Sequence, residues 1–340
     1  MNKHLLFVLP LVATLLASCE SVSSSSSLVS SPEGSSTGED DYEVQTISPA
    51  GAPTLAFYDQ GSNVSFQTDS TPSNVGKHFL TSTYDAIVFD SVNALKTIST
   101  KAAPFKLARF ITGGNFYVVS YGKDPTDVPT KDSTFVSFGE GLLPDTVMNK
   151  LVASYDGWER WDMPSITYLA GVSDVMSALL AHSYDYYFIA QPALFGAKSQ
   201  LGSDASKVNV VANVRAAWAD FSGQPSIPQA GLFIRNATYS DHQAYVDKYL
   251  SDLDSRLTVA VDDPASAKAA MDAWNGDTAA QQAKFGFSSS VAYNVQKDDA
   301  NGFGIVKPGS LGSTNLTFLN SFVDLLDSSS YSHFDSSLFL

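Results

Sequence analysis

Short apolar runs of strand length alternate along this chain with segments that have the period of a helix. Residues 54–58 and 86–89 have the length and composition of buried strands, and residues 74–80 between them have a helical pattern. The alternation returns with strand-like residues 134–138 and 186–190. Strands that alternate with helices form parallel sheets covered by helices, so we predict an α/β fold.

One pattern occurs twice in the predicted folded part. In residues 83–95 and again in 183–195, a Tyr-Asp pair precedes a short apolar strand, a small polar turn and a helical segment. Any α/β protein contains strand-to-helix units, which is the simpler explanation. Because the copies fall in different halves of the folded part, we expect two lobes, with ligand beyond the carboxyl ends of these strands.

Composition predicts where the chain passes between the lobes. A polar stretch rich in Asp, Pro and Thr over residues 122–133 marks a first crossing, and a Gly-Gln-Pro turn near residue 224 marks the return. We therefore predict one lobe from residues 49–125 together with 226–340, and a second lobe from residues 126–225.

The amino-terminal segment predicts export and lipid attachment at Cys19, the only cysteine of the chain. A basic start and a short apolar run precede it, which is typical of a signal peptide rather than of a membrane span. Small residues followed by cysteine resemble the bacterial lipoprotein signal, although cleavage elsewhere is the alternative. We predict a signal over residues 1–19, a flexible Ser-rich, acidic tether over residues 20–48, and anchorage at the extracytoplasmic face of a bacterial membrane.

Charge and motif content argue against two classes of function. The formal net charge of -15 disfavours a nucleic-acid partner, because phosphate binding requires clustered lysine and arginine. The histidines stand apart from one another, and the sequence contains neither metal-ligand spacing nor a Gly-x-Ser-x-Gly nucleophile motif. We therefore expect no catalysis, no metal and no cofactor.

Candidate ligand-binding residues lie where predicted strands end and helices begin. They are Tyr58, Asp59, Gln60, Asp90, Ser91, Asn93, Glu140, Gly141 and Gln191, with Tyr117 and Trp218 as rings for stacking. Ser, Asn and Asp at such positions also cap helices, which is the structural alternative for each. The carboxylates among them would repel an anion, so we expect a neutral or cationic ligand, and the rings favour a flat heterocycle.

Three segments resemble the substrate-binding lipoproteins of ABC importers, in the branch that handles nitrate, sulfonates, taurine and thiamine-pyrimidine precursors. They are residues 84–93, the Gly-Glu-Gly-Leu-Leu-Pro-Asp stretch 139–145, and residues 184–193. The resemblance implies a two-lobed, type II periplasmic-binding-protein-like fold, with two sheets flanked by helices and a ligand cleft between the lobes. It also implies delivery of a small solute to ABC permease subunits, and we expect a monomer. The sequence departs from the family over residues 58–71, where the first helix and the next strand are shortened or replaced.

Two other functions remain open. A surface structural or adhesion lipoprotein on the same fold would bind a protein or glycan on an outer face. A precursor-processing enzyme on this scaffold would need a reactive group in the cleft. Ligand-dependent closure without turnover would distinguish an importer subunit from both.

Overall fold

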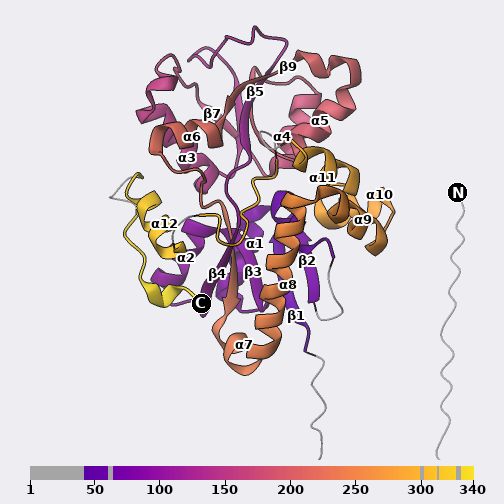
Figure 1. The fold of residues 1–340 in the computed structure, drawn as a ribbon. Helices are drawn as coiled ribbons and strands as arrows, with labels where there is room; N and C mark the ends of the chain where they lie inside the picture. Colours follow the sequence, from indigo (N-terminus) through magenta and orange to yellow (C-terminus); the bar gives the residue numbers. More distant parts are fainter. Residues whose placement is uncertain (1–41, 60–63, 299–301, 312–313, 327–330) are drawn as a thin grey trace, which may run out of the picture. The chain divides into compact units, whose positions relative to one another are not determined.

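The computed structural model describes residues 42–59, 64–298, 302–311, 314–326 and 331–340 (Figure 1). Residues 41–340 form one compact unit. The predicted signal with Cys19, the tether up to residue 41 and the candidate residue Gln60 lie outside the described residues. Within the described ranges, no helix is both long and apolar enough to cross a membrane.

The first sheet, sheet A, contains five strands in the order β2-β1-β3-β10-β4. Strands β1, β2 and β3 are parallel, whereas β10 is antiparallel to both of its neighbours. The strands are β1 (Val44–Pro49), β2 (Val64–Asp69), β3 (Ala86–Asp90), β4 (Phe105–Thr112) and β10 (Ala230–Arg235). We call sheet A and its helices lobe 1.

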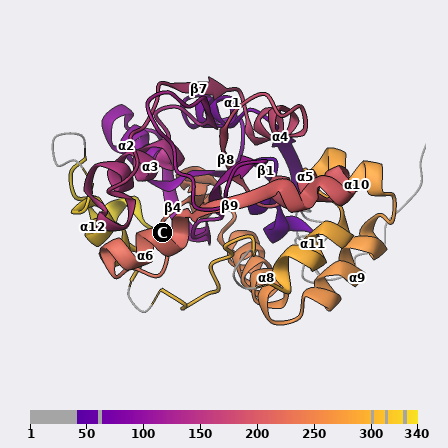
Figure 2. The same ribbon diagram turned by 90° about the horizontal axis from the view of Figure 1, so that it is seen from above.

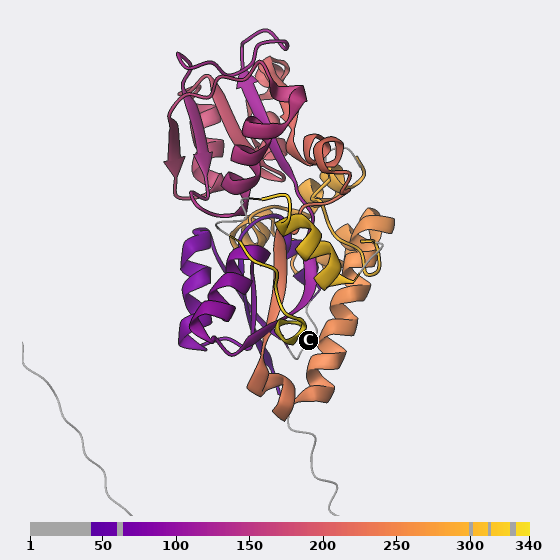
Figure 3. The ribbon, with the colours of Figure 1, turned by 90° about the vertical axis from the view of Figure 1, so that its left-hand side faces the viewer.

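The second sheet, sheet B, repeats this plan in the order β7-β6-β8-β5-β9. Its strands are β5 (Phe116–Tyr121), β6 (Phe135–Phe138), β7 (Ile166–Leu169), β8 (Tyr186–Ala190) and β9 (Val208–Asn213). Strand β5 is antiparallel to both neighbours, as β10 is in sheet A. We call sheet B and its helices lobe 2, and Figure 3 shows the two lobes one above the other.

Helices cover the two sheets and join them. Those of lobe 1 are η1 (Ala52–Phe57), α1 (Pro72–Thr81), α2 (Ser91–Lys101), α7 (Asn236–Asp241), α8 (Gln243–Asp262), α9 (Pro264–Trp274), α10 (Thr278–Phe285) and α11 (Ser289–Gln296). Those of lobe 2 are α3 (Leu143–Ser154), η2 (Asp156–Trp158), α4 (Val172–Leu180), α5 (Ala193–Leu201), η3 (Gly202–Lys207) and α6 (Val214–Ser222). The carboxyl-terminal segment adds α12 (Asn315–Val323) and η4 (Ser336–Leu338).

Both faces of the central strand β3 are buried, which explains why its sequence is apolar without alternation. Ala86 and Val88 belong to the hydrophobic core that includes α8, whereas Ile87 and Phe89 belong to the core that includes α1 and α2. Successive side chains of a strand point to opposite faces, so a strand covered by helices on both sides is apolar throughout. The predicted α/β class is therefore confirmed.

The carboxyl-terminal helix α12 contacts both lobes. Phe318 packs edge to face on Phe110 of β4, with ring centroids 5.6 Å apart, and Phe322 packs on Trp218 of α6, with centroids 4.8 Å apart. Figure 2 shows α12 beside α6. The segment after Lys307, whose role the sequence leaves open, therefore packs against lobe 2 as well as lobe 1.

The chain leaves sheet A earlier than the predicted crossing over residues 122–133. It crosses at residues 113–115, where Gly114 adopts a φ of 104° between β4 and β5. Residues 116–121 therefore belong to lobe 2, and the polar stretch that follows is a largely exposed loop beyond β5. The return passes near residue 224, as predicted, and places β10 in sheet A.

The start of the folded part also differs from the prediction. Residues 44–49, assigned to the tether, form β1, which pairs with β2 and β3. Residues 54–57, predicted as a strand, lie in the short 3-10 helix η1. Pro53 fits the first turn of that helix, and the complete burial of η1 explains its strand-like composition.

The repeated Tyr-Asp pattern has a shared structural role. In lobe 1, Gln45 N–H donates to Asp85 Oδ2 at 3.0 Å and Asp85 N–H donates back to the Gln45 carbonyl at 2.9 Å. In lobe 2, Thr134 N–H donates to Asp185 Oδ2 at 2.8 Å and Asp185 N–H donates back to the Thr134 carbonyl at 3.2 Å. Each aspartate thus fixes the register of two neighbouring parallel strands at their amino-terminal ends.

The two aspartates differ in burial. Asp85 is paired with Arg235 and also accepts a bond from Thr238 at 2.7 Å, and its side chain is 6% exposed. Asp185 is paired with Lys123 at 2.9 Å, and its side chain is 35% exposed. A buried ion pair that loses one partner leaves an uncompensated charge, whereas an exposed pair contributes little.

We expect Asp85→Ala to lower the free energy of unfolding by about 3 kcal/mol, because it leaves the Arg235 guanidinium and two further donors without their acceptor. The matched change Asp185→Ala should cost about 1 kcal/mol, because water replaces the lost contacts. Urea unfolding of both variants measures the difference. Equal losses would contradict a dominant role for burial.

Candidate functional site

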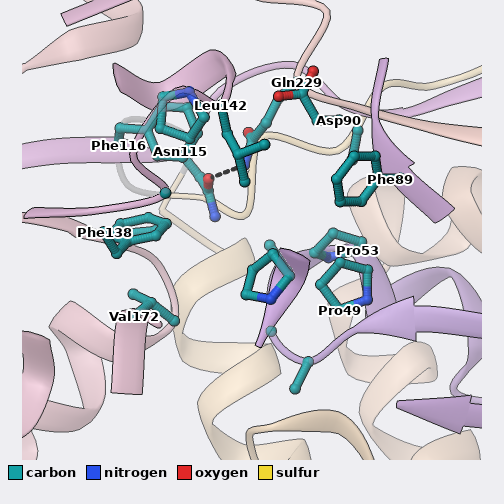
Figure 4. A pocket seen from close by; sticks show the side chains of 18 of the residues that line it. Pro49, Pro53, Phe89, Asp90, Asn115, Phe116, Phe138, Leu142, Val172 and Gln229 are labelled. Carbon is teal, nitrogen blue, oxygen red and sulfur yellow. Dashed lines mark hydrogen bonds between the residues drawn. The ribbon is translucent and has the colours of Figure 1, made fainter. Parts of the chain in front are cut away.

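A pocket lies between the lobes, at the carboxyl ends of β1, β3, β6 and β8, and we call it the interlobe pocket (Figure 4). Its volume is about 100 Å³, enough for several water molecules. The residues that line it are Pro49, Ala50, Gly51, Ala52, Pro53, Ser70, Pro72, Phe89, Asp90, Asn115, Phe116, Phe138, Gly139, Leu142, Pro144, Val172, Ala190, Gln191, Gln229 and Ala230.

Asp90 connects the two lobes at this pocket. Its Oδ1 accepts hydrogen bonds from Val92 N–H at 3.1 Å and Asn93 N–H at 3.0 Å, and so caps α2. Its Oδ2 accepts from Asn93 Nδ2 at 2.8 Å and, across the pocket, from the N–H of Leu143 at 2.5 Å. Because Leu143 is the first residue of α3 in lobe 2, this last bond holds the lobes together.

Asp90 is buried, with 9% of the residue exposed, and burial raises the pKa of its carboxyl group above the ordinary value for aspartate. The four N–H donors oppose this shift, because they stabilise the charged form. Asn93 strengthens the connection between the lobes, since its Nδ2 also lies 3.4 Å from the Gly141 carbonyl. The loop that begins helix α3 is therefore held against the start of helix α2.

Three carboxamides form the polar floor of the pocket. Asn115 lies on the first crossing between the sheets, Gln229 lies on the second, and Gln191 follows β8. Asn115 Nδ2 donates to the Gln191 carbonyl at 2.5 Å, and Gln229 Nε2 donates to Asn115 Oδ1 at 2.9 Å. Both crossings and the end of β8 are thereby joined.

The remaining wall is apolar. Phe89, Phe116 and Phe138 contribute rings, and prolines close much of the perimeter (Figure 4). The lining contains no lysine or arginine, and Asp90 is its one ionisable side chain among the residues that the structure describes. This lining is suited to a neutral ring with few polar groups.

Of the predicted site residues, Asp90 and Gln191 line the pocket. Glu140 and Gly141 lie on the adjoining loop, where Gly141 N–H donates to Asp145 at 3.0 Å. Asn93 reaches that loop as described above, whereas Ser91 is completely buried and its N–H donates to the Gln229 carbonyl at 3.2 Å.

Tyr58 and Asp59 do not lie at the interlobe pocket. Arg256 of α8 donates through Nη1 to the Asp59 carbonyl at 2.9 Å, and Tyr58 Oη lies 3.4 Å from the Arg256 carbonyl. Both residues follow the short helix η1, which carries the chain away from the pocket toward α8. Their prediction assumed that residues 54–58 were a strand ending at the cleft.

Tyr117 and Trp218 are also outside the interlobe pocket. Successive residues of β5 face opposite ways, so Phe116 lines the interlobe pocket while Tyr117 lines a separate cavity with Arg215. Burial raises the pKa of Tyr117 to about 12. Trp218 of α6 is completely buried and packs on Phe322 of α12.

Sequence reasoning missed Asn115, Gln229 and the pocket-facing rings of Phe116 and Phe138. The Gly-Gly-Asn turn at residues 113–115 lies inside the predicted first lobe, residues 49–125, and nothing in its sequence marks it as a crossing. Gln229 follows the predicted return crossing without any local motif. Within the described residues, no cluster of three His, Cys, Asp or Glu side chains could hold a metal ion.

We expect Asp90→Ser to separate the two roles of this residue. Serine still caps α2, but its shorter side chain does not reach Leu143, so the variant should lose about 1 kcal/mol of stability and adopt a more open arrangement of the lobes. Small-angle X-ray scattering would then show a larger radius of gyration than for the wild type. Asp263→Ser, which changes the exposed cap of α9 in lobe 1, is the control. Identical scattering from both variants and the wild type would show that Asp90 does not hold the lobes together.

The scan against protein-family models and the search of curated proteins found no match for this chain. Solved structures with a similar fold include an ABC transporter protein from Parabacteroides distasonis, at 16% identity and a TM-score of 0.61, over 88% of this chain and 98% of that one. The alkanesulfonate-binding protein SsuA from Xanthomonas axonopodis pv. citri, bound to MOPS, is similar at 11% identity and a TM-score of 0.53, over 77% and 85% of the chains.

A third similar structure is the Candida albicans CA3427 gene product, described as having the generic periplasmic-binding-protein fold. It is 8% identical, with a TM-score of 0.55, over 87% of this chain and 92% of that one. At these identities the likeness establishes the fold alone. The predicted two-lobed periplasmic-binding-protein-like fold, with two sheets flanked by helices, is therefore confirmed.

Proposed function

We propose that this chain is the lipid-anchored, solute-binding subunit of an ABC importer. It captures a small organic molecule, neutral or cationic, in the interlobe pocket and delivers it to permease subunits at the extracytoplasmic face of the membrane. It acts as a monomer and catalyses no reaction. The observation that carries this proposal is the bond from Leu143 N–H to Asp90, which joins the lobes beside the pocket.

The construction of the pocket supports a link between binding and closure. Loops from β1 and β3 of lobe 1 face loops from β6 and β8 of lobe 2, so a molecule between them contacts both lobes. A ligand shifts a conformational equilibrium only by its difference in affinity between the two states. Contacts from both lobes exist together only when the lobes are closed, and this supplies that difference.

The charge of the pocket supports a neutral or cationic ligand. Transfer of an anion into a pocket without a cation is unfavourable, and the buried Asp90 carboxylate adds repulsion. The ligand reported for the SsuA relative therefore does not transfer to this chain. The rings of Phe89, Phe116 and Phe138 favour a flat heterocycle, as the sequence predicts.

Thermal unfolding of residues 20–340 tests the proposal with a panel of pyrimidines, thiamine, flavins, polyamines, sulfonates and nitrate. A ligand at one hundred times its dissociation constant stabilises the native state by about 2.7 kcal/mol, so one class should raise the midpoint by several degrees. The ligand should be recovered unchanged, which would show that the protein binds it without turnover. A flat panel would contradict solute capture in favour of adhesion.

A pair of identical substitutions locates the binding site. Val172→Trp should abolish the ligand-dependent rise in the midpoint, because Val172 lines the pocket at the start of α4. Val210→Trp is the control, since Val210 is 43% exposed on β9 and lies outside the pocket lining. Loss of the rise in both variants, or in neither, would place the ligand elsewhere.

A further inference from the structure

The three carboxamides of the interlobe pocket are held in one orientation by backbone groups. Gln191 Oε1 accepts from Phe195 N–H at 3.0 Å, and Gln229 Oε1 accepts from Gly114 N–H at 2.9 Å. Asn115 Nδ2 donates to the Gln191 carbonyl, and Asn115 Oδ1 accepts from Gln229 Nε2. Because a backbone N–H can only donate and a carbonyl can only accept, none of these amides can be flipped without losing bonds.

This orientation turns each amide oxygen toward the protein and leaves amide hydrogens for a ligand. Asn115 Nδ2 and Gln229 Nε2 each use one of two hydrogens, and Gln191 Nε2 makes no hydrogen bond within the described residues. Gln191 lines the pocket with 5% of its surface exposed, and its Nε2 atom is part of that small exposed area. The polar floor therefore presents donors.

Acceptors on the same wall are already occupied. Asp90 accepts four hydrogen bonds, which fills the usual capacity of a carboxylate. The hydroxyl of Ser70, which can donate or accept, lies at an exposed position on the rim. Each amide oxygen also accepts one bond from the protein and is turned toward that donor. An ammonium group in the pocket would therefore exchange its water for few well-placed side-chain acceptors, and that exchange is unfavourable.

We infer that the ligand is an uncharged ring compound with carbonyl or ring-nitrogen acceptors, bound by the amide hydrogens of Asn115, Gln191 and Gln229. This inference rests on the proposed solute-binding function and narrows its ligand class by excluding cations. Anions have suitable acceptors, but the lining residues provide no cation to balance them and Asp90 lies beside the floor. The rings of Phe89, Phe116 and Phe138 supply flat surfaces around these donors (Figure 4).

Three probes of similar size and different charge test the inference on residues 20–340. Benzamide is neutral and carries a carbonyl acceptor, benzylamine is a cation with donors, and benzenesulfonate is an anion with acceptors. In thermal unfolding, benzamide should raise the midpoint by several degrees at saturation, and the other two should leave it unchanged.

Gln191→Glu should reverse the preference. The new side chain keeps an oxygen for Phe195 N–H but replaces the free amide donor by a charged acceptor. The affinity for benzamide should fall at least tenfold, and benzylamine should now raise the unfolding midpoint. Gln243→Glu makes the same change at an exposed position of α8 and should keep the wild-type pattern. Far-UV circular dichroism verifies folding, and the wild-type probe series decides alone if the Gln191 variant does not fold.

The outcomes separate this inference from the function beneath it. A midpoint raised by benzylamine or benzenesulfonate as much as by benzamide would overturn the ligand class and leave solute capture intact. If none of the three probes changes the midpoint, the charge of the compound that binds in the wider panel tests the ligand class in the same way. Silence in both series would overturn the ligand class and the solute-binding function together.

Discussion

The structure depends on one buried carboxylate that accepts hydrogen bonds from both lobes. Asp90 ends β3, caps α2 and accepts the first N–H of α3, so a side chain of sheet A determines where lobe 2 begins its first helix. Burial without a cation is costly for a carboxylate, and four N–H donors offset that cost only while the lobes are together. Separation of the lobes breaks the bond to Leu143 but lets water solvate the carboxylate. The loss and the gain offset each other, so the closed and open arrangements can be close in free energy, as a hinge motion requires.

The two sheets share a plan that brings equivalent positions to the pocket. Asp85 and Asp185 fix the same register at the start of β3 and β8. Each strand then delivers a polar side chain at its carboxyl end, Asp90 five residues after Asp85 and Gln191 six residues after Asp185. Strands β5 and β10 are exchanged between the lobes, so the crossings that carry Asn115 and Gln229 must pass the same point. Connectivity, rather than local propensity, assembles the amide floor.

The contrast between local patterns and long-range connections explains what could be predicted from the sequence. Strand-to-helix units are local, so the repeated Tyr-Asp pattern, Asp90, Gln191 and the α/β class could all be identified. The amides of Asn115 and Gln229 belong to crossings, and only the pairing of β5 with sheet B shows that residues 113–115 connect the lobes. Tyr58 and Trp218 were misplaced because buried aromatic residues look alike in a sequence, whether they face a cleft or a core.

Distance measurements between the lobes test the central claim, that the Asp90 bond closes them over a ligand. Residues 20–340 contain no cysteine, so Lys77→Cys on α1 and Ser177→Cys on α4 give one exposed spin-label site in each lobe. Electron–electron double resonance should show one short distance with a bound ligand, an added longer distance without it, and a dominant longer distance in the Asp90→Ser background. One unchanged distance under all three conditions would contradict closure by Asp90.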